Sequence, residues 1–294
     1  MNATPSEMTE IQGRARAWAQ VLRLPFRQQR WRGQAGGFMG QGTGSSLEFQ
    51  DHRAYVPGDD PRHINWQAYA RTGSYTMKVH REEVRPQVDV LLDASASMSA
   101  YPIKWQRTLE LLAFVLEAAF SAGASVRAFA LRGPVHALLE MEILRSGRWC
   151  EVLERMPGGG AAEPPLLSHL PLRGGSMRVL VSDLLFPAAP EPLLAQLTCG
   201  QGRGIVFVPH CSSESSPGWR GNHEFVDAET LLPQEYRVEP VVLKRYLQAY
   251  ARHFDLWRAA ALKLGTALAR VESEAGFLDA MRAEALSIHA VEVA

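Results

Sequence analysis

The chain is poor in cysteine and carries no net charge. Its 294 residues include three cysteines, and the charges of its 31 basic and 31 acidic residues cancel. Cys150, Cys199 and Cys211 are widely spaced and odd in number, which fits neither a disulfide framework nor a zinc site, so we expect reduced thiols. A net charge of zero provides no global attraction to nucleic acids or anionic membranes. Partners must therefore be recognised by local surfaces.

Long apolar runs are also absent. No window approaches the roughly 18 consecutive apolar residues of a membrane-spanning helix, and Met1 to Glu10 lacks the charged-then-apolar pattern of a secretion signal. We therefore expect no membrane insertion and a cytoplasmic location. With 46% hydrophobic and 21% charged residues, the composition is that of a globular protein. The length suggests one large domain or about two ordinary ones.

Residues 1–85 are interpreted as an amino-terminal extension. Arginines between residues 14 and 32 alternate with apolar side chains, which indicates either a basic amphipathic helix for an acidic or membrane surface or, more simply, a solvated face. Gly33 to Gly44 is glycine-rich but lacks the preceding strand and the following Lys of a phosphate-binding loop, so a flexible turn is the better interpretation. Asp60 before a proline predicts a helix start, with the helix running to about Arg71.

Residues 86–294 are interpreted as a second domain in which strands alternate with helices. This alternation is typical of an α/β fold with a doubly wound, mostly parallel sheet and helices on both faces. Apolar residues at helical spacing over Pro240 to Leu268 predict a packed helix. The runs that carry the alternation are strands near 88–92, 125–131, 135–139, 177–183 and 204–209, with helices near 104–121, 147–156, 190–197 and 276–285.

Polar side chains follow two of the predicted strands. Asp93, Ser95 and Ser97 come directly after the first strand of this domain, and Asp183 ends a later one. The carboxyl ends of parallel strands lie at one edge of the sheet, where such folds bind ligands. Carboxylate and hydroxyl oxygens are ligands that Mg²⁺ prefers. We therefore predict a Mg²⁺ site formed by these four residues, with an open position for a partner's carboxylate. The simpler alternative is that they terminate strands and cap helices.

Two motifs point to known families. The Asp93-x-Ser95-x-Ser97 segment with Asp183 resembles the metal-ion-dependent adhesion site of von Willebrand factor A domains. The charged segment from Glu48 to Arg71, which contains Pro57-Gly58-Asp59-Asp60, resembles the signature of domain-of-unknown-function family number 58, bacterial proteins that accompany MoxR-type AAA+ ATPases. Asp227, Glu229 and Thr230 match the later pattern of that family.

The resemblance implies a protein-binding adaptor rather than an enzyme. Such an adaptor would work beside a MoxR-type ATPase in assembling or activating an unidentified client protein. The adhesion-site pattern also expects a Thr in a loop that reads Gly158 to Glu163 here and contains no hydroxyl. One direct metal ligand is therefore missing unless water, Glu163 or Ser168 replaces it. The Glu48 to Arg71 segment is assigned to domain packing or to ATPase docking.

Three other functions are compatible with parts of the sequence. A metal-dependent hydrolase or phosphotransferase could use Asp93 as nucleophile, but Ser95 stands where the most similar enzymes need a second Asp. A nucleic-acid binder could use the amino-terminal arginines, although the zero net charge argues against it. A purely structural scaffold would keep the fold without any metal.

Overall fold

The computed structural model describes residues 4–26, 35–39, 49–57, 60–80, 83–157 and 163–294. The chain forms two compact units. The larger comprises Met1–Pro25 with Gln87–Ala294, and the smaller comprises Phe26–Pro86. The division predicted from the sequence, 1–85 and 86–294, therefore needs one correction, because the first 25 residues group with the larger unit.

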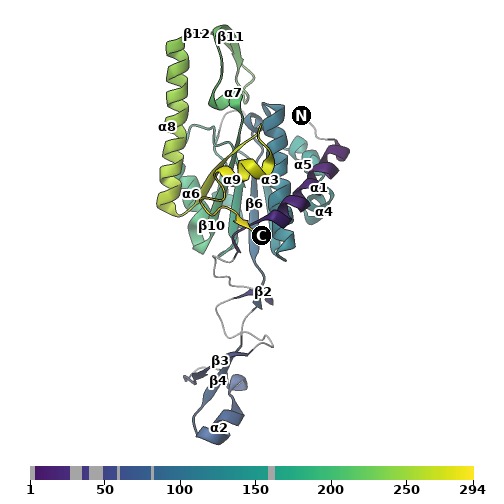
Figure 1. Cartoon of the computed structure of the whole chain (residues 1–294), viewed down its shortest axis with the longest axis vertical. Coiled ribbons are helices and arrows are strands. Elements are labelled where there is room, and N and C mark those ends of the chain that lie inside the picture. Colours follow the sequence, from purple (N-terminus) through teal and green to yellow (C-terminus); the bar gives the residue numbers. More distant parts are fainter. Residues whose placement is uncertain (1–3, 27–34, 40–48, 58–59, 81–82, 158–162) are drawn as a thin grey trace. The chain divides into compact units, whose positions relative to one another are not determined.

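Helix α1 (Pro5–Val21) accounts for this correction. It packs along α3 (Pro102–Ser121), as Figure 1 shows. The Trp18 ring stacks on Phe277 with centroids 3.9 Å apart, and Arg14 forms an ion pair with Glu110 at 3.0 Å. The described arginines Arg14 and Arg16 thus form ion pairs with Glu110 and Glu117 of α3, while Arg27, Arg30 and Arg32 lie outside the described residues. The buried side chains of α1 are Met8, Ile11 and Ala15.

The larger unit is built on a six-stranded sheet with the order β13-β10-β9-β6-β7-β8. All neighbouring pairs are parallel except β7 and β8. The predicted mixed α/β class with a mostly parallel sheet flanked by helices is confirmed. The strands are β6 (Gln87–Asp93), β7 (Ser125–Arg132), β8 (Val135–Leu139), β9 (Met177–Val181), β10 (Arg203–His210) and β13 (Ala267–Glu272).

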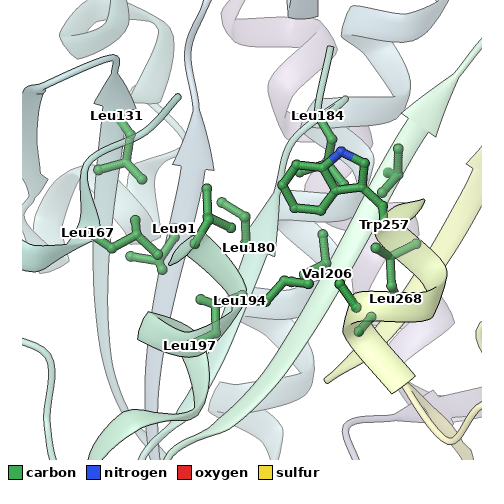
Figure 2. Packing of buried hydrophobic residues seen from close by; sticks show 14 of the residues in the cluster. Leu91, Leu131, Leu167, Leu180, Leu184, Leu194, Leu197, Val206, Trp257 and Leu268 are labelled. Atoms are coloured by element: carbon green, nitrogen blue, oxygen red, sulfur yellow. The ribbon is translucent and has the colours of Figure 1, made fainter. Parts of the chain in front are cut away.

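Helices cover both faces of the sheet. On one face α3 contacts β6, β7, β9 and β10, and 14 of its 20 residues are buried. On the other face, α6 (Pro190–Thr198) and α8 (Pro240–Leu264) pack their apolar side chains on the strands, as Figure 2 shows for Leu194, Trp257 and Leu180. Each fully buried side chain of this size contributes about 1.5–3 kcal/mol to folding.

Two glycines in the left-handed conformation set helix boundaries that the sequence pattern missed. Gly147 has φ 72° and ends α4 (Met141–Ser146), a helix that was not predicted, whereas the helix predicted over 147–156 is present as α5 (Trp149–Arg155). Gly265 has φ 69° and ends α8, so the predicted helix to Leu268 is too long. The chain then turns back into β13, an edge strand that was not predicted.

Shorter elements complete the larger unit. Strands β1 (Leu22–Arg23) and β14 (Glu292–Val293) pair with each other, and β11 (Gly221–Val226) pairs with β12 (Pro233–Val238) in an antiparallel hairpin. The remaining helices are α7 (Ser212–Ser215), α9 (Phe277–Ala283) and the 3-10 turns η3 (Ala96–Ser99), η4 (Leu167–His169) and η5 (Cys199–Gln201).

The described part of the smaller unit contains two strand pairs and one short helix. Strand β2 (Ala35–Met39) pairs with β5 (Glu83–Val84), and β3 (Phe49–Ala54) pairs with β4 (Thr76–His80). Asp60 caps a 3-10 turn, η2 (Pro61–His63), and Asn65 caps α2 (Trp66–Thr72). The helix predicted up to Arg71 is therefore divided, because Ile64 is extended. Most of the glycine-rich segment, including Gly40 to Gly44, lies outside the described residues.

None of the described helices combines enough length with enough apolar character to cross a membrane. The longest, α8, has 25 residues. It alternates apolar and charged side chains, and Leu256 and Leu262 on its outer face are exposed.

Candidate functional site

Two acids lie at the carboxyl edge of the sheet, where the strand order reverses. Asp93 is the last residue of β6, and Asp183 follows β9 by two residues. These strands are parallel neighbours, with Leu92 opposite Val181. The chain continues from β6 to β7 on one side while β9 lies on the other, and such a reversal is where open α/β sheets bind ligands. The structure thus brings both acids to one edge, and it also places them close enough to interact.

Asp93 is buried and fully hydrogen-bonded. Its side chain accepts the Ser95 amide at 2.9 Å and the Ser182 hydroxyl at 2.6 Å, and the residue is 1% exposed. Burial and the neighbouring charge of Asp183 raise the pKa of Asp93 to about 6, against the opposing effect of these hydrogen bonds. A carboxylate held in this way fixes the loop after β6.

The two serines of the motif lie next to each other, and their loop binds a distant acid of the same chain. The Ser95 and Ser97 hydroxyl oxygens are 3.2 Å apart. The Ser97 amide donates to Oε1 of Glu229 at 2.9 Å. Glu229 belongs to the turn between β11 and β12, which is 132 residues away in sequence. A carboxylate therefore already occupies the main-chain donor of this loop.

Asp227 shapes the turn that delivers Glu229. Its Oδ1 atom accepts the amides of Glu229 and Thr230 and the Thr230 hydroxyl, at 2.7–3.0 Å. The Thr230 amide and hydroxyl bonds lower the pKa of Asp227, so the carboxylate stays ionised and holds the turn. Asp227, Glu229 and Thr230 thus form one local structure, in which Asp227 and Thr230 build the turn and Glu229 reaches the loop after β6.

A buried lysine lies beneath the loop. Lys104, in the first turn of α3, is 0% exposed. Its ammonium donates to Oδ2 of Asp183 at 2.9 Å and to Oε1 of Glu214. Burial by itself lowers the pKa of Lys104, but the two carboxylates overcome this effect and raise it above its usual value. The lysine is therefore a permanent positive charge inside the protein.

The two acids that hold Lys104 are themselves fixed. Oδ1 of Asp183 accepts the Leu185 amide at 3.1 Å. Oε2 of Glu214 accepts the Cys211 amide at 3.2 Å, and the Glu214 carbonyl accepts the Tyr246 hydroxyl at 2.7 Å. Burial and the adjacent Glu214 raise the pKa of the Cys211 thiol to about 12, so this cysteine is not a thiolate at neutral pH. Both acids are thus held by a main-chain amide as well as by the lysine.

The donor set fits a divalent cation only in part. Asp93, Ser95 and Ser97 offer oxygen ligands that Mg²⁺ prefers, but the Asp183 carboxylate is paired with Lys104. Within the described ranges, no group of three or more His, Cys, Asp or Glu side chains is arranged to hold a metal. With Lys104 in place, the residues present do not fit the four-ligand Mg²⁺ site that was predicted from the sequence.

The loop expected to supply a Thr ligand is described only in part. Its residues 158–162 lie outside the described ranges. Glu163 lies beside Gly133 at the end of β7, and Ser168 is exposed in η4. Arg132 links this side of the site to the motif, because its guanidinium donates to the Ala94 carbonyl at 2.9 Å and to the carbonyls of Met156 and Pro157.

Sequence reasoning missed Lys104 and Glu214 as members of the site. A signal for Lys104 was available: it repeats at helical spacing with Thr108, Leu111 and Val115, all on the buried side of α3, and a lysine on such a face needs an acid partner. Glu214 carried no comparable signal, because it lies in a four-residue helix after β10. Glu229 was noticed as part of a pattern, but its contact with Ser97 depends on the tertiary fold.

Comparison with known proteins gives one family match. Residues 51–136 match the model of a family described as protein of unknown function DUF58. No curated protein matches the chain. Among solved structures, the chain is similar to an aerotolerance-related membrane protein from Bacteroides fragilis NCTC 9343 with multiple mutations to serines, with 13% identity, a TM-score of 0.38, and coverage of 69% of this chain and 98% of that chain. The DUF58 match includes Asp93 to Ser97 and Lys104, and it ends before Asp183, Glu214 and Glu229.

Proposed function

We propose that this chain is a non-enzymatic protein-binding adaptor with a von Willebrand factor A-like domain, acting with a MoxR-type AAA+ ATPase to assemble or activate client proteins. The sheet order, the helices on both faces and the Asp93-x-Ser95-x-Ser97 motif at the strand reversal support the domain assignment. The DUF58 match over residues 51–136 supports the association with the ATPase through the family resemblance.

The contact between Ser97 and Glu229 carries the proposal for binding. The loop after β6 holds a carboxylate by a main-chain N–H at 2.9 Å, so its geometry already suits an acidic side chain. Glu229 is half-buried and is carried by a hairpin whose strands have mostly exposed or half-buried side chains. A client acid would therefore bind by displacing Glu229. In this account the hairpin is an internal competitor for the client site.

A hydrolase that uses Asp93 is a weaker alternative. A nucleophilic carboxylate must reach its substrate, whereas Asp93 is 1% exposed and both of its oxygens accept hydrogen bonds from the protein. We therefore propose a structural role for Asp93, in which it holds the loop that presents the Ser97 amide.

The smaller unit offers a surface for the ATPase. Tyr69 and Tyr75 stack with centroids 4.5 Å apart, and Trp66 meets both rings edge-on. Trp66 is 57% exposed and Tyr75 48% exposed, and α2 has no buried residue. Exposed aromatic side chains that lie together are typical of the central residues of protein interfaces. Since this cluster lies within the DUF58 match, we assign it to ATPase docking.

Binding of the full-length chain to the MoxR-type ATPase of its own genome tests the proposal. Trp66→Ala with Tyr75→Ala should weaken binding by at least about 30-fold, the effect of losing one interface hot spot of about 2 kcal/mol. Leu262→Ala, on the exposed side of α8 in the larger unit at 85% exposure, is the matched control and should bind as the unmodified chain does. The proposal is wrong if the unmodified chain binds no such ATPase.

A further inference from the structure

The ammonium of Lys104 stands where a bound metal would have to neutralise the acids at this edge. We infer that Lys104 is the built-in cation of the site, so that the edge formed by Asp93, Asp183 and Glu214 works without a divalent metal. The inference concerns this cluster alone and does not depend on the identity of any partner.

The cluster draws its members from separate parts of the larger unit. Lys104 comes from α3, Asp183 from the segment after β9 and Glu214 from α7. All three are buried, with relative exposures of 0%, 2% and 8%. Carboxylates buried to this degree need a partner that carries positive charge. In the described structure, that partner for both Asp183 and Glu214 is the lysine.

A divalent ion at Asp183 would compete directly with this lysine. The ammonium lies 2.9 Å from Oδ2 of Asp183, and the other oxygen of that carboxylate accepts a main-chain amide. An ion bound to the same carboxylate would lie within a few ångströms of a like charge in a region with little solvent to screen it. Lys104 is completely buried, so its ammonium does not reach solvent from this position while an ion occupies the carboxylate.

The remaining acid, Asp93, is compensated by a different means. Two hydrogen bonds, from the Ser95 amide and the Ser182 hydroxyl, satisfy its oxygens. Each oxygen of Asp93 thus has a hydrogen-bond donor from the protein, and these bonds offset part of the cost of burying the carboxylate. The site is thus complete in its own side chains, and removal of the lysine should convert it into a site for an added cation.

Mg²⁺ titration of the full-length chain tests the inference. Isothermal calorimetry and thermal unfolding with MgCl₂ are compared for the unmodified chain, Lys104→Met and the control Lys263→Met, which removes an exposed lysine near the end of α8. The unmodified chain and the control should show no saturable heat and no Mg²⁺-dependent rise in Tm. Lys104→Met should bind Mg²⁺ at least about tenfold more tightly than the unmodified chain does, and Mg²⁺ should raise its Tm. Adding Asp183→Asn to this variant should remove the rise in Tm.

Two results would overturn the inference. One is saturable Mg²⁺ binding by the unmodified chain that Asp93→Asn abolishes, because the metal would then coexist with the lysine. The other is a folded Lys104→Met variant that does not respond to Mg²⁺. If this variant does not fold, Lys104→Met with Glu214→Gln replaces it under the same two criteria, and the titration of the unmodified chain decides if neither folds.

Discussion

Lys104→Met is expected to destabilise the larger unit by about 3–5 kcal/mol, which is the usual effect of breaking a buried ion pair from one side. The methionine keeps most of the apolar stem of the lysine, so little of this loss comes from packing. It comes from Asp183 and Glu214, which are left buried at 2% and 8% exposure without their cation. Since 1 kcal/mol moves the Tm of a domain of this size by about 2–4 °C, the shift should exceed about 6 °C.

Urea unfolding followed by circular dichroism measures this change. The test is sharper with a neutral triple variant, Lys104→Met with Asp183→Asn and Glu214→Gln, which removes the charges together. The triple variant leaves no uncompensated buried charge, and its Asn and Gln side-chain oxygens can still accept the amides of Leu185 and Cys211, so it should recover part of the loss. The control Lys263→Met should stay within about 0.5 kcal/mol of the unmodified chain. The reasoning is refuted if Lys104→Met costs less than about 1 kcal/mol, or if the triple variant is no more stable than the single one.

Three further predictions follow from the same structure. Glu229→Ala frees the Ser97 amide and should raise the affinity for an acidic client, measured by interferometry, by about fivefold, or about 1 kcal/mol. An unchanged or lower affinity would show that Glu229 does not compete with the client for this amide. Burial, together with the charge of Arg270, lowers the pKa of His210 to about 4. As the pH falls from about 6.5 to 4, the unfolded chain binds a proton at this histidine before the folded chain does, so stability is lost over this range. The plot of Tm against pH should be flatter for His210→Asn than for the unmodified chain, and parallel plots would show that His210 does not cause the loss of stability. Trp18→Ala removes the ring stacked on Phe277 and should cost about 1 kcal/mol in urea unfolding, whereas no change would mean that α1 is not docked as described.

The position of the site could be predicted from the sequence because it depends on strand ends. Mostly apolar runs before Asp93 and Asp183 marked two buried strands, and parallel pairing then required both acids to lie at one edge. The register between β6 and β9 shows this arrangement. The sequence pattern could not predict the charge of that edge. The lysine that neutralises it, Lys104, comes from the next helix, and the second acid bound to that lysine, Glu214, comes from beyond β10.

The differences in the fold have similarly specific causes. Helix α1 groups with the larger unit because its docking depends on Phe277, which is far away in sequence. Strand β13 was read as the end of a helix, since Leu264 and Leu268 continue the helical spacing. Gly265 in the left-handed conformation interrupts that spacing, and a single glycine near the end of a periodic run is a weak signal.

The most direct test of the site is a crystal structure of the full-length chain grown with MnCl₂ and measured at the manganese absorption edge. We predict that Lys104 Nζ lies within hydrogen-bond distance of Asp183, as it does here at 2.9 Å, and that no anomalous peak appears between Asp93 and Asp183. A manganese ion coordinated by Asp93, Ser95, Ser97 and Asp183, with the lysine displaced, would contradict the account.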